Sequence, residues 1–155
     1  MKPELSLFLD NIRSVHNVGS IFRTADAVGI SRIYCAGVTP TPVDRFGRTR
    51  KDFAKTALGS EKELPWEHVS DAELFLRGKK NEGVEVFVLE QTPKSHPYTE
   101  AKLSRPTILV LGNEVDGVSQ QLVELADECL VIPMRGMKES LNVSVAAGIV
   151  VYHLL

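Results

Sequence analysis

The chain has 155 residues, of which 43% are hydrophobic and 25% charged, and its formal net charge is −2. This is the composition of an ordinary globular protein, and we expect a single domain over residues 1–155. No apolar run approaches the roughly 20 residues that span a bilayer. The N-terminal residues also lack a signal-peptide pattern, so we expect a cytoplasmic protein with no membrane segment.

The first 40 residues predict a strand, a helix and a second strand. Residues 5–12 alternate imperfectly between apolar and polar side chains, as a strand does. From Val18 the apolar residues follow helical spacing, Asn17 stands in the N-cap position, and Gly29 stands where a helix-ending glycine would. A strand over residues 32–36 completes a β–α–β unit, which requires parallel strands.

The rest of the chain continues this alternation. We expect helices over residues 53–58, 70–80 and 119–126, and strands over residues 84–89, 107–111 and 129–132. The predicted fold class is therefore α/β, with a mainly parallel sheet and helices on both faces.

The final predicted helix, from Leu141 to Leu155, is apolar nearly all round, and Ser140 stands in its N-cap position. One side of its own domain cannot cover so apolar a helix. We therefore expect either a deep core or a partner subunit to bury it.

Positive charge is concentrated early in the chain. Residues 1–60 contain nine Lys and Arg against five Asp and Glu, whereas residues 61–155 contain nine against fifteen. Five of the cations lie in DRFGRTRKDFAK, residues 44–55, where Phe46 and Phe53 could supply stacking or packing surface. On composition alone, a solvated face and a phosphate-contacting patch explain this segment equally well.

Three predicted strands are followed by polar loops, at residues 10–19, 112–119 and 133–142. Because the carboxyl ends of parallel strands meet at one edge of a sheet, we expect these loops to form one site. The loop GNEVDG has the glycine spacing of a P-loop, but Val118 replaces the lysine, and NVGSIFR lacks the dinucleotide-binding glycines. The loops instead favour a ligand without phosphates, such as adenosine or a cationic nucleoside that carries an amino acid.

Three blocks, NVGSIFRTADAVGI, LVLGNEVDGVS and IPMRGMKESLNVSVAAGIVVYHLL, resemble the motifs of the SpoU/TrmH branch of the SPOUT RNA methyltransferases. The blocks have the expected order and spacing, and the resemblance spans Leu5 to Leu155. It implies transfer of a methyl group from S-adenosylmethionine to a ribose 2′-hydroxyl in RNA. It also implies a C-terminal deep trefoil knot and a homodimer with the active site at its interface.

Five residues match catalytic positions of these motifs: Arg23, Asn17, Glu114, Ser140 and Asn142. Arg23 is the first choice, because a guanidinium can stabilise a developing alkoxide or hold the adjacent phosphate. Its alternative is a surface salt bridge. Asn17 could orient Arg23 or only cap the helix, and Glu114 could order the arginine or be a solvated carboxylate. Ser140 and Asn142 could simply begin the last helix, but polar side chains before so apolar a segment suggest a ligand.

Strand-end backbone groups and apolar side chains are expected to hold S-adenosylmethionine. The six residues are Leu111, Gly112, Gly117, Ile132, Met134 and Leu141. For Ile132 and Leu141 the alternative is a role in the core alone. The four histidines are scattered, and the two cysteines lie in apolar runs, so we expect neither a metal site nor a disulfide.

The resemblance also assigns the basic residues to RNA. The expected contacts are Arg13, Arg45, Arg48, Arg50, Lys51 and Lys55. Transfer RNA is favoured over ribosomal RNA, and the C-terminal helix is expected to close the homodimer. One alternative is an RNA-binding protein with this fold but no catalysis, which the five catalytic matches disfavour. The other is a Rossmann-like nucleotide enzyme, which the missing glycines and lysine disfavour.

Overall fold

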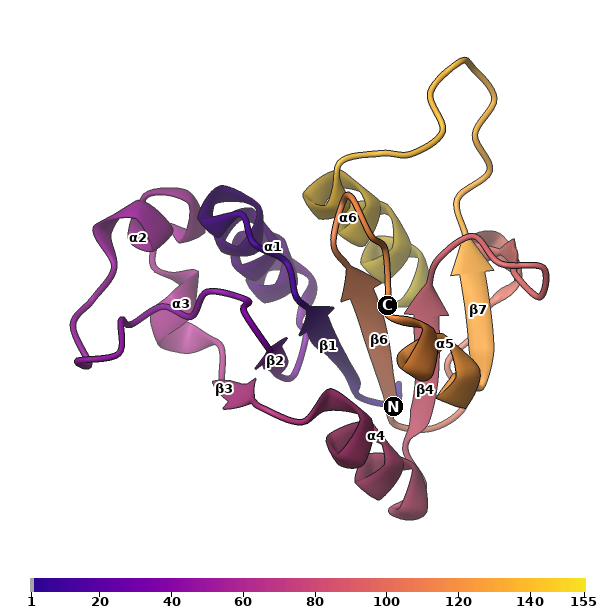
Figure 1. Cartoon of the computed structure of the whole chain (residues 1–155), viewed down its shortest axis with the longest axis horizontal. Helices are drawn as coiled ribbons and strands as arrows, with labels where there is room; N and C mark the ends of the chain where they lie inside the picture. The colour runs from indigo at the N-terminus through magenta and orange to yellow at the C-terminus, as the bar shows by residue number, and fades with distance from the viewer. Residues whose placement is uncertain (1) are drawn as a thin grey trace.

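The computed structural model describes residues 2–155, and its centre is a seven-stranded sheet in which every strand pair is parallel (Figure 1). The strand order is β3-β2-β1-β6-β4-β7-β5. The strands are β1 (Leu5–Asp10), β2 (Ile33–Ala36), β3 (Trp66–Val69), β4 (Glu85–Leu89), β5 (His96–Pro97), β6 (Thr107–Gly112) and β7 (Glu128–Val131). The predicted α/β class is confirmed, whereas the short strands β3 and β5 were not predicted.

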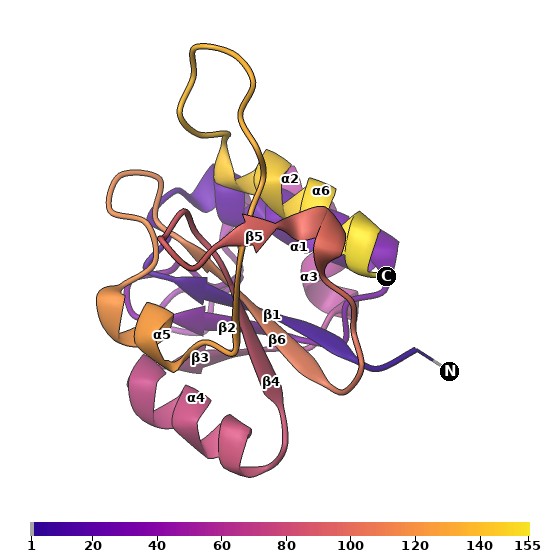
Figure 2. The same ribbon diagram turned by 90° about the vertical axis from the view of Figure 1, so that its right-hand side faces the viewer.

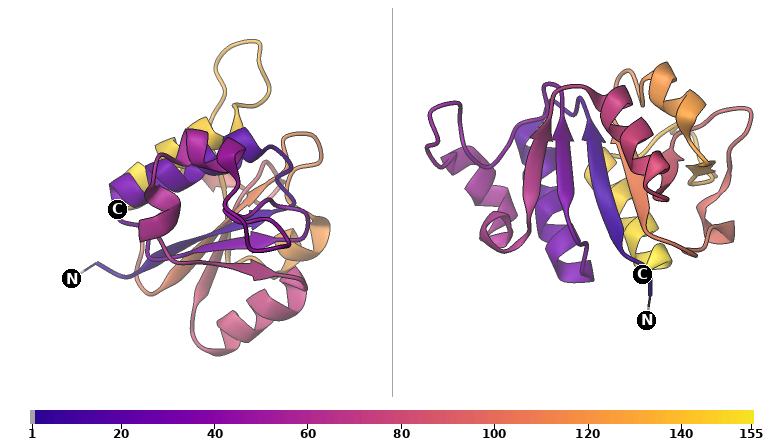
Figure 3. Two further views of the ribbon diagram at one scale, coloured as in Figure 1. Left: turned by 90° about the vertical axis from the view of Figure 1, so that its left-hand side faces the viewer. Right: turned by 90° about the horizontal axis from the view of Figure 1, so that it is seen from below.

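Helices cover both faces of the sheet (Figure 2). They are α1 (Val15–Val28), α2 (Lys51–Ala57), α3 (Ser60–Glu63), α4 (Ala72–Asn81), the 3₁₀-helix η1 (Tyr98–Glu100), α5 (Gln120–Leu125) and α6 (Val143–Leu154). The views in Figures 2 and 3 place α1, α2, α3 and α6 on one face, and α4 and α5 on the other. None of the helices found within residues 2–155 is long and apolar enough to cross a membrane.

Two hydrophobic cores lie on the two faces, and β1 contributes to both. Leu7 and Leu9 pack on the side of α1 and α6, whereas Phe8 packs on the side of α4 and α5. This follows from the two-residue period of a strand. Cys35 is buried in the first core, and burial raises the pKa of its thiol to about 12. Cys129 is also buried and free, so the expectation of buried, unpaired thiols is confirmed.

Both predicted helix starts next to the site are wrong by two or three residues. The N-cap of α1 is Ser14, whose hydroxyl accepts a hydrogen bond from the backbone of Asn17 at 3.1 Å, so Asn17 lies inside the helix. The N-cap of α6 is Asn142, not Ser140. In each region several good capping residues lie close together, and local sequence does not distinguish between them.

Helix α6 is buried on one side and open on the other. Ala147, Val150 and Val151 are buried in the core against α1 and β6, whereas Val145 and Tyr152 are 51% and 60% exposed. The single chain therefore leaves an apolar stripe of this helix uncovered.

Candidate active site

The three polar loops predicted to meet do so at the carboxyl edge of the sheet. Asp10, at the end of β1, is buried, and its carboxylate accepts hydrogen bonds from the backbone and hydroxyl of Ser119 at 2.9 and 3.0 Å. The side-chain amide of Asn113 donates to the backbone carbonyl of Asn11 at 2.9 Å. Ser119 holds the N-cap position of α5, but its hydroxyl serves this link and does not cap the helix. The loops after β1 and β6 are thus joined by their own polar groups.

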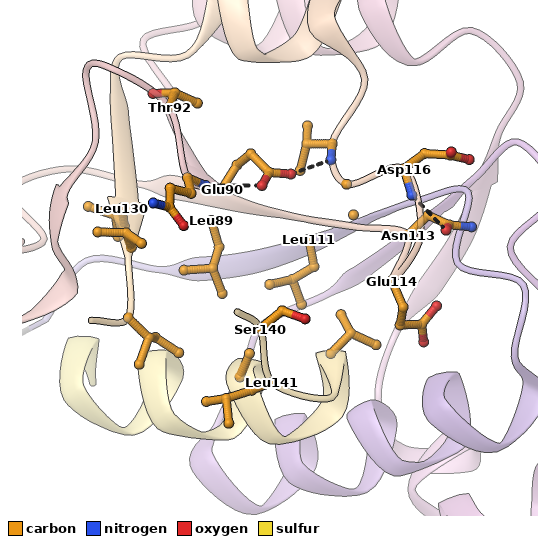
Figure 4. Close-up of a pocket in the computed structure, with 18 of the residues that line it drawn as sticks. Leu89, Glu90, Thr92, Leu111, Asn113, Glu114, Asp116, Leu130, Ser140 and Leu141 are labelled. Atoms are coloured by element: carbon orange, nitrogen blue, oxygen red, sulfur yellow. Dashed lines mark hydrogen bonds between the residues drawn. The ribbon is translucent and has the colours of Figure 1, made fainter. Parts of the chain in front are cut away.

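A pocket of about 470 Å³ opens beside the ends of β4, β6 and β7 (Figure 4). All six residues expected to hold a cofactor line it: Leu111, Gly112, Gly117, Ile132, Met134 and Leu141. Two of the expected catalytic residues, Glu114 and Ser140, line it as well. Figure 4 shows Leu89, Leu111 and Leu141 directed into the same space, so the pocket has an apolar floor.

One wall of this pocket was missed from the sequence. It is formed by residues 89–92, at the end of β4 and just after it. The carboxylate of Glu90 accepts hydrogen bonds from the backbone of Val118 at 2.8 Å and of Gln91 at 3.0 Å, and so fixes the loop after β6 (Figure 4). The sequence did indicate that Glu90 follows a predicted parallel strand. It did not indicate that this strand, β4, lies between β6 and β7 in the sheet.

The pocket lining is acidic. Its charged side chains are Glu90, Glu114, Asp116 and Glu139, and the lining found among residues 2–155 contains no Lys, Arg or His. Such a pocket repels a phosphate and attracts a cation. The electrostatics therefore agree with the predicted phosphate-free ligand. Within the same residues, no group of three or more His, Cys, Asp or Glu is arranged to hold a metal ion.

Glycine at position 112 keeps the pocket wall closely packed. A Cβ atom at Gly112 would lie within 2.6 Å of the carbonyl oxygen of Gly117 and would also overlap the backbone of Val118. Gly117 itself has a φ of +70°, a conformation that favours glycine. The two glycines therefore allow two backbone segments to approach each other in the wall of the acidic pocket.

Gly112→Ala is expected to shift the loop after β6 and lower the free energy of unfolding by about 1–3 kcal/mol, because the added methyl meets backbone atoms. The affinity for S-adenosylmethionine should fall at the same time. Thermal unfolding and calorimetry measure the two effects. Gly136→Ala is the matched control, since a Cβ there has no atom within 4 Å. Equal behaviour of the two variants would contradict the proposed role of Gly112.

A chain of amide and carboxylate groups joins the three motifs. The side-chain amide of Asn17, on α1, donates to the carboxylate of Glu114, and its oxygen accepts from the Asn142 amide at 3.1 Å. The oxygen of Asn142 also accepts from the backbone of Ser144 at 2.9 Å and of Val145 at 3.4 Å. Asn142 thus caps α6 and contacts Asn17 at once. The structure brings together three of the five expected catalytic residues in direct contact.

Two substitutions separate the roles of Asn142. Asn142→Ala removes the cap and should cost about 1 kcal/mol of stability, or about 2–4 °C in Tm. Asn142→Asp keeps the capping oxygen but replaces the amide that donates to Asn17, so its Tm should stay near that of the wild type while methyl transfer falls. Thermal unfolding with a transfer assay tests this. Full activity in Asn142→Asp would show that the contact with Asn17 is dispensable.

Arg23 lies outside the acidic pocket. It is exposed on α1 and lines a separate hollow of about 520 Å³ with His16, Lys55 and Tyr152, between α1, α2 and α6. The alternative prediction for Arg23 was a surface salt bridge. Among residues 2–155, the lining of this hollow contains no Asp or Glu with which Arg23 could form one. Arg23 is therefore next to the uncovered stripe of α6, since Tyr152 belongs to both.

The predicted RNA-contacting residues divide into three places. Arg45, Arg48 and Arg50 line a third hollow, between β2 and α2, and Lys55 shares the hollow of Arg23. Arg13 and Lys51 are exposed. Arg48 and Arg50 pair with carboxylates of their own segment, Asp44 at 2.9 Å and Asp52 at 3.4 Å, whereas Phe53 is fully buried. Phe53 is therefore a core residue and not part of a stacking surface.

Comparison with known sequences decides the family. The sequence profile described as the SpoU rRNA Methylase family matches residues 4–152. The chain belongs to this family. This SpoU-family chain is 38% identical, over 151 residues, to a protein of Aquifex aeolicus named tRNA (guanosine(18)-2′-O)-methyltransferase. It is 34% identical, over 148 residues, to the 23S rRNA (guanosine-2′-O-)-methyltransferase RlmB of Vibrio parahaemolyticus.

The fold comparison agrees with the family. The structure of an AdoMet-bound rRNA methyltransferase from Sinorhizobium meliloti matches 99% of the SpoU-family chain, with 30% sequence identity and a TM-score of 0.88. These matches cover 97%, 96% and 99% of this chain, but only 68% of the Aquifex protein, 57% of the Vibrio protein and 56% of the Sinorhizobium chain. The relatives thus contain additional segments outside the shared domain.

Proposed function

We propose that residues 1–155 act as one methyltransferase domain, which transfers a methyl group from S-adenosylmethionine to a ribose 2′-hydroxyl of RNA. The observation that carries this proposal is the contact between Asn17, Glu114 and Asn142 at the edge of the acidic pocket. It unites the three motifs in one site. The names of the Aquifex and Vibrio relatives, both RNA 2′-O-methyltransferases, support the reaction.

The pocket fits S-adenosylmethionine in shape and charge. Leu89, Leu111 and Leu141 supply apolar surface for an adenine ring, and backbone groups beside Gly112 and Gly117 are available to hydrogen-bond its edge. Carboxylates in the lining suit the positively charged sulfur and the amino group of the ligand. S-Adenosylmethionine supplies an electrophilic methyl group, so the protein has to place a ribose oxygen in front of it and assist the loss of its proton.

The five predicted catalytic residues act on the ribose, directly or by positioning one another. Glu114 and Ser140 lie at the exposed edge of the pocket, where a ribose that reaches the methyl group would contact them. Asn17 keeps the Glu114 carboxylate in place through a hydrogen bond, and Asn142 in turn donates a hydrogen bond to Asn17. Arg23 stabilises negative charge on the ribose oxygen and holds the neighbouring phosphate through its forked donors.

Arg23 can serve this site if a second copy of the chain completes it. We infer a homodimer closed by α6, because its open stripe includes Val145 and Tyr152 and lies next to Arg23. A dimer contact along this stripe would cover the apolar side chains. It would also bring Arg23 of one protomer towards the pocket of the other.

We favour transfer RNA over ribosomal RNA, because the Aquifex tRNA enzyme is the more similar of the two relatives. We also propose the trefoil knot that the family resemblance implies. Strand β7 lies beside β4, whereas α6, which follows it in the chain, packs on α1 and β6. The chain therefore runs back across the sheet between β7 and α6, and this path supports the proposal. A cytoplasmic location is proposed as well, and the two free cysteines are consistent with it.

Two experiments test the proposed function. Calorimetry should detect binding of S-adenosylmethionine and none of NAD, whereas binding of NAD alone would contradict the assignment. Mapping of 2′-O-methyl sites in total RNA should show one site lost in cells that lack this protein. That site would also identify the RNA.

A further inference from the structure

A hairpin between β2 and α2 presents an aromatic ring to solvent. It comprises residues 43–49, and in Figure 1 the segment that contains it lies on the side of the molecule away from β7. Phe46 is 65% exposed, and the guanidinium carbons of Arg45 and Arg48 each lie 4.9 Å from its ring centroid. An exposed ring between two cations makes no contribution to either hydrophobic core.

The hairpin is held in shape by Asp44. Its backbone N–H donates to the Arg48 carbonyl at 2.9 Å. Its carboxylate accepts from the backbone of Phe46 at 2.8 Å, and from the backbone and Nε of Arg48 at 3.0 and 2.9 Å. The backbone hydrogen bond from Arg48 lowers the pKa of this carboxyl. The turn is completed by Gly47, with a φ of +78°. The ring is therefore presented by a preformed loop, which reduces the entropy lost when a ligand binds.

A hollow lies beside this ring. Its volume is about 670 Å³, and its lining includes Pro40, Thr41, Arg50 and His68 together with the hairpin. This volume lies within the range of pockets that accept small ligands or parts of larger ones. As described over residues 2–155, the lining contains three arginines, Arg45, Arg48 and Arg50, against one carboxylate, Asp44, and is therefore positive on balance, in contrast to the acidic cofactor pocket.

We propose that Phe46, flanked by Arg45 and Arg48, is a stacking platform for an unpaired base of the RNA substrate; this rests on the proposed function. Every nucleobase has a flat face that stacks on an aromatic ring or a guanidinium plane. The arginines also neutralise the phosphates on either side of the stacked nucleotide. A base in a continuous duplex is covered by its neighbours, so the platform selects nucleotides in a single-stranded loop.

The position of the hairpin fits this role. It follows β2, and β1 alone separates β2 from β6, whose end forms the cofactor pocket. Neighbouring strands are about 4.8 Å apart, so the carboxyl ends of β2 and β6 are separated by roughly 10 Å. The hairpin starts at Val43, beyond the end of β2 at Ala36, and therefore stands farther from the pocket than this. A single strand of RNA can span this separation. The stacked base would therefore belong to a nucleotide some way along the strand from the methylated one, and would help to position that strand at the site.

The test uses Phe46→Leu, which keeps an apolar side chain but removes the aromatic face, and Phe46→Trp, which retains one. Fluorescence anisotropy measures affinity for a single-stranded oligoribonucleotide and for an RNA duplex at several salt concentrations. Phe46→Leu should weaken single-strand binding about tenfold, in the range of base–aromatic stacking, without changing the salt dependence. Phe46→Trp should restore it, and duplex binding should be unaffected.

Two controls separate stacking from charge and from folding. Arg45→Gln should remove about one phosphate contact and so reduce the slope of log affinity against log salt concentration by about 1. Phe46→Leu should leave this slope unchanged. Leu74→Ala, at an apolar residue 69% exposed on α4, should change neither affinity nor slope. Calorimetry with S-adenosylmethionine should give the same affinity for Phe46→Leu as for the wild type.

Unchanged single-strand affinity in Phe46→Leu would overturn the proposal and leave a protein partner as the occupant of this surface. Equal losses for single strand and duplex would overturn it too. These outcomes are distinct from failure of the proposed function. If the wild type binds single strands through Phe46 yet methylates no RNA, the platform is supported and the enzymatic proposal fails. If it methylates RNA and Phe46→Leu does so with the same KM, the platform alone fails.

Discussion

Arg23→Ala is expected to reduce methyl transfer by at least about 100-fold, the loss typical for removal of one group that stabilises charge in a transition state. The affinity for S-adenosylmethionine should stay within about twofold of the wild type, because Arg23 lies outside the cofactor pocket, in the hollow beside Tyr152. Single-turnover kinetics and calorimetry measure the two quantities. The combination is specific to a residue that acts on the ribose and not on the cofactor.

Two further variants control this experiment. Arg23→Lys retains the charge but loses the forked donors, so it should recover only part of the rate. Arg77→Ala removes an exposed arginine from α4, where it pairs with Glu73 at 2.9 Å, and should leave the rate unchanged. Wild-type turnover in Arg23→Ala would remove Arg23 from the site.

Val145→Asp is expected to convert a dimer to a monomer and to weaken cofactor binding about tenfold or more. Val145 is 51% exposed on the open stripe of α6, whereas the next residue, Ala146, lines the cofactor pocket. A buried unpaired carboxylate at a dimer contact costs several kcal/mol, so the contact should not form. The first turn of α6 would then lose the support that keeps the adjacent pocket wall in place. Ile149→Asp should behave in the same way.

Light scattering and calorimetry measure these two effects on one sample. Leu74→Asp places the same charge on an exposed apolar position of α4, on the other face of the sheet, and should remain dimeric with normal affinity. A monomeric Val145→Asp that binds S-adenosylmethionine normally would refute the coupling. A dimeric one would refute the interface.

Apolar runs and periodicity in the sequence were sufficient for the main strands and helices. The residues from Leu7 to Asp10 in β1 are all buried because both faces of the sheet are covered, whereas buried side chains in α1 repeat every three or four residues. Helix starts were less predictable. Ser14 and Asn17 are both good caps, and Asn17 is inside α1 because its side chain contacts Glu114 and Asn142, which are distant in sequence. The first turn of α1 thus serves the site, and local sequence does not report such contacts.

The candidate site was predictable where it follows from strand ends. The six residues predicted to hold the cofactor line one pocket because β6 and β7 run parallel and their loops meet. The role of Glu90 was not predictable, since it depends on β4 lying between these strands. The position of Arg23 outside the pocket was not predictable either. The motif identifies Arg23 by its neighbours in sequence, but the face of α1 on which it lies places it beside Tyr152.

Identification of the methylated product is the most direct test of methyl transfer to a ribose 2′-hydroxyl. The protein is incubated with S-adenosylmethionine that carries a deuterated methyl group and with RNA from cells that lack the protein. The RNA is then digested and its nucleosides are analysed by mass spectrometry. If the proposed 2′-O-methyl transfer is right, one nucleoside should carry the deuterated methyl on its ribose 2′-oxygen. Deuterated methyl found only on a base, or in no nucleoside although S-adenosylmethionine binds, would contradict it.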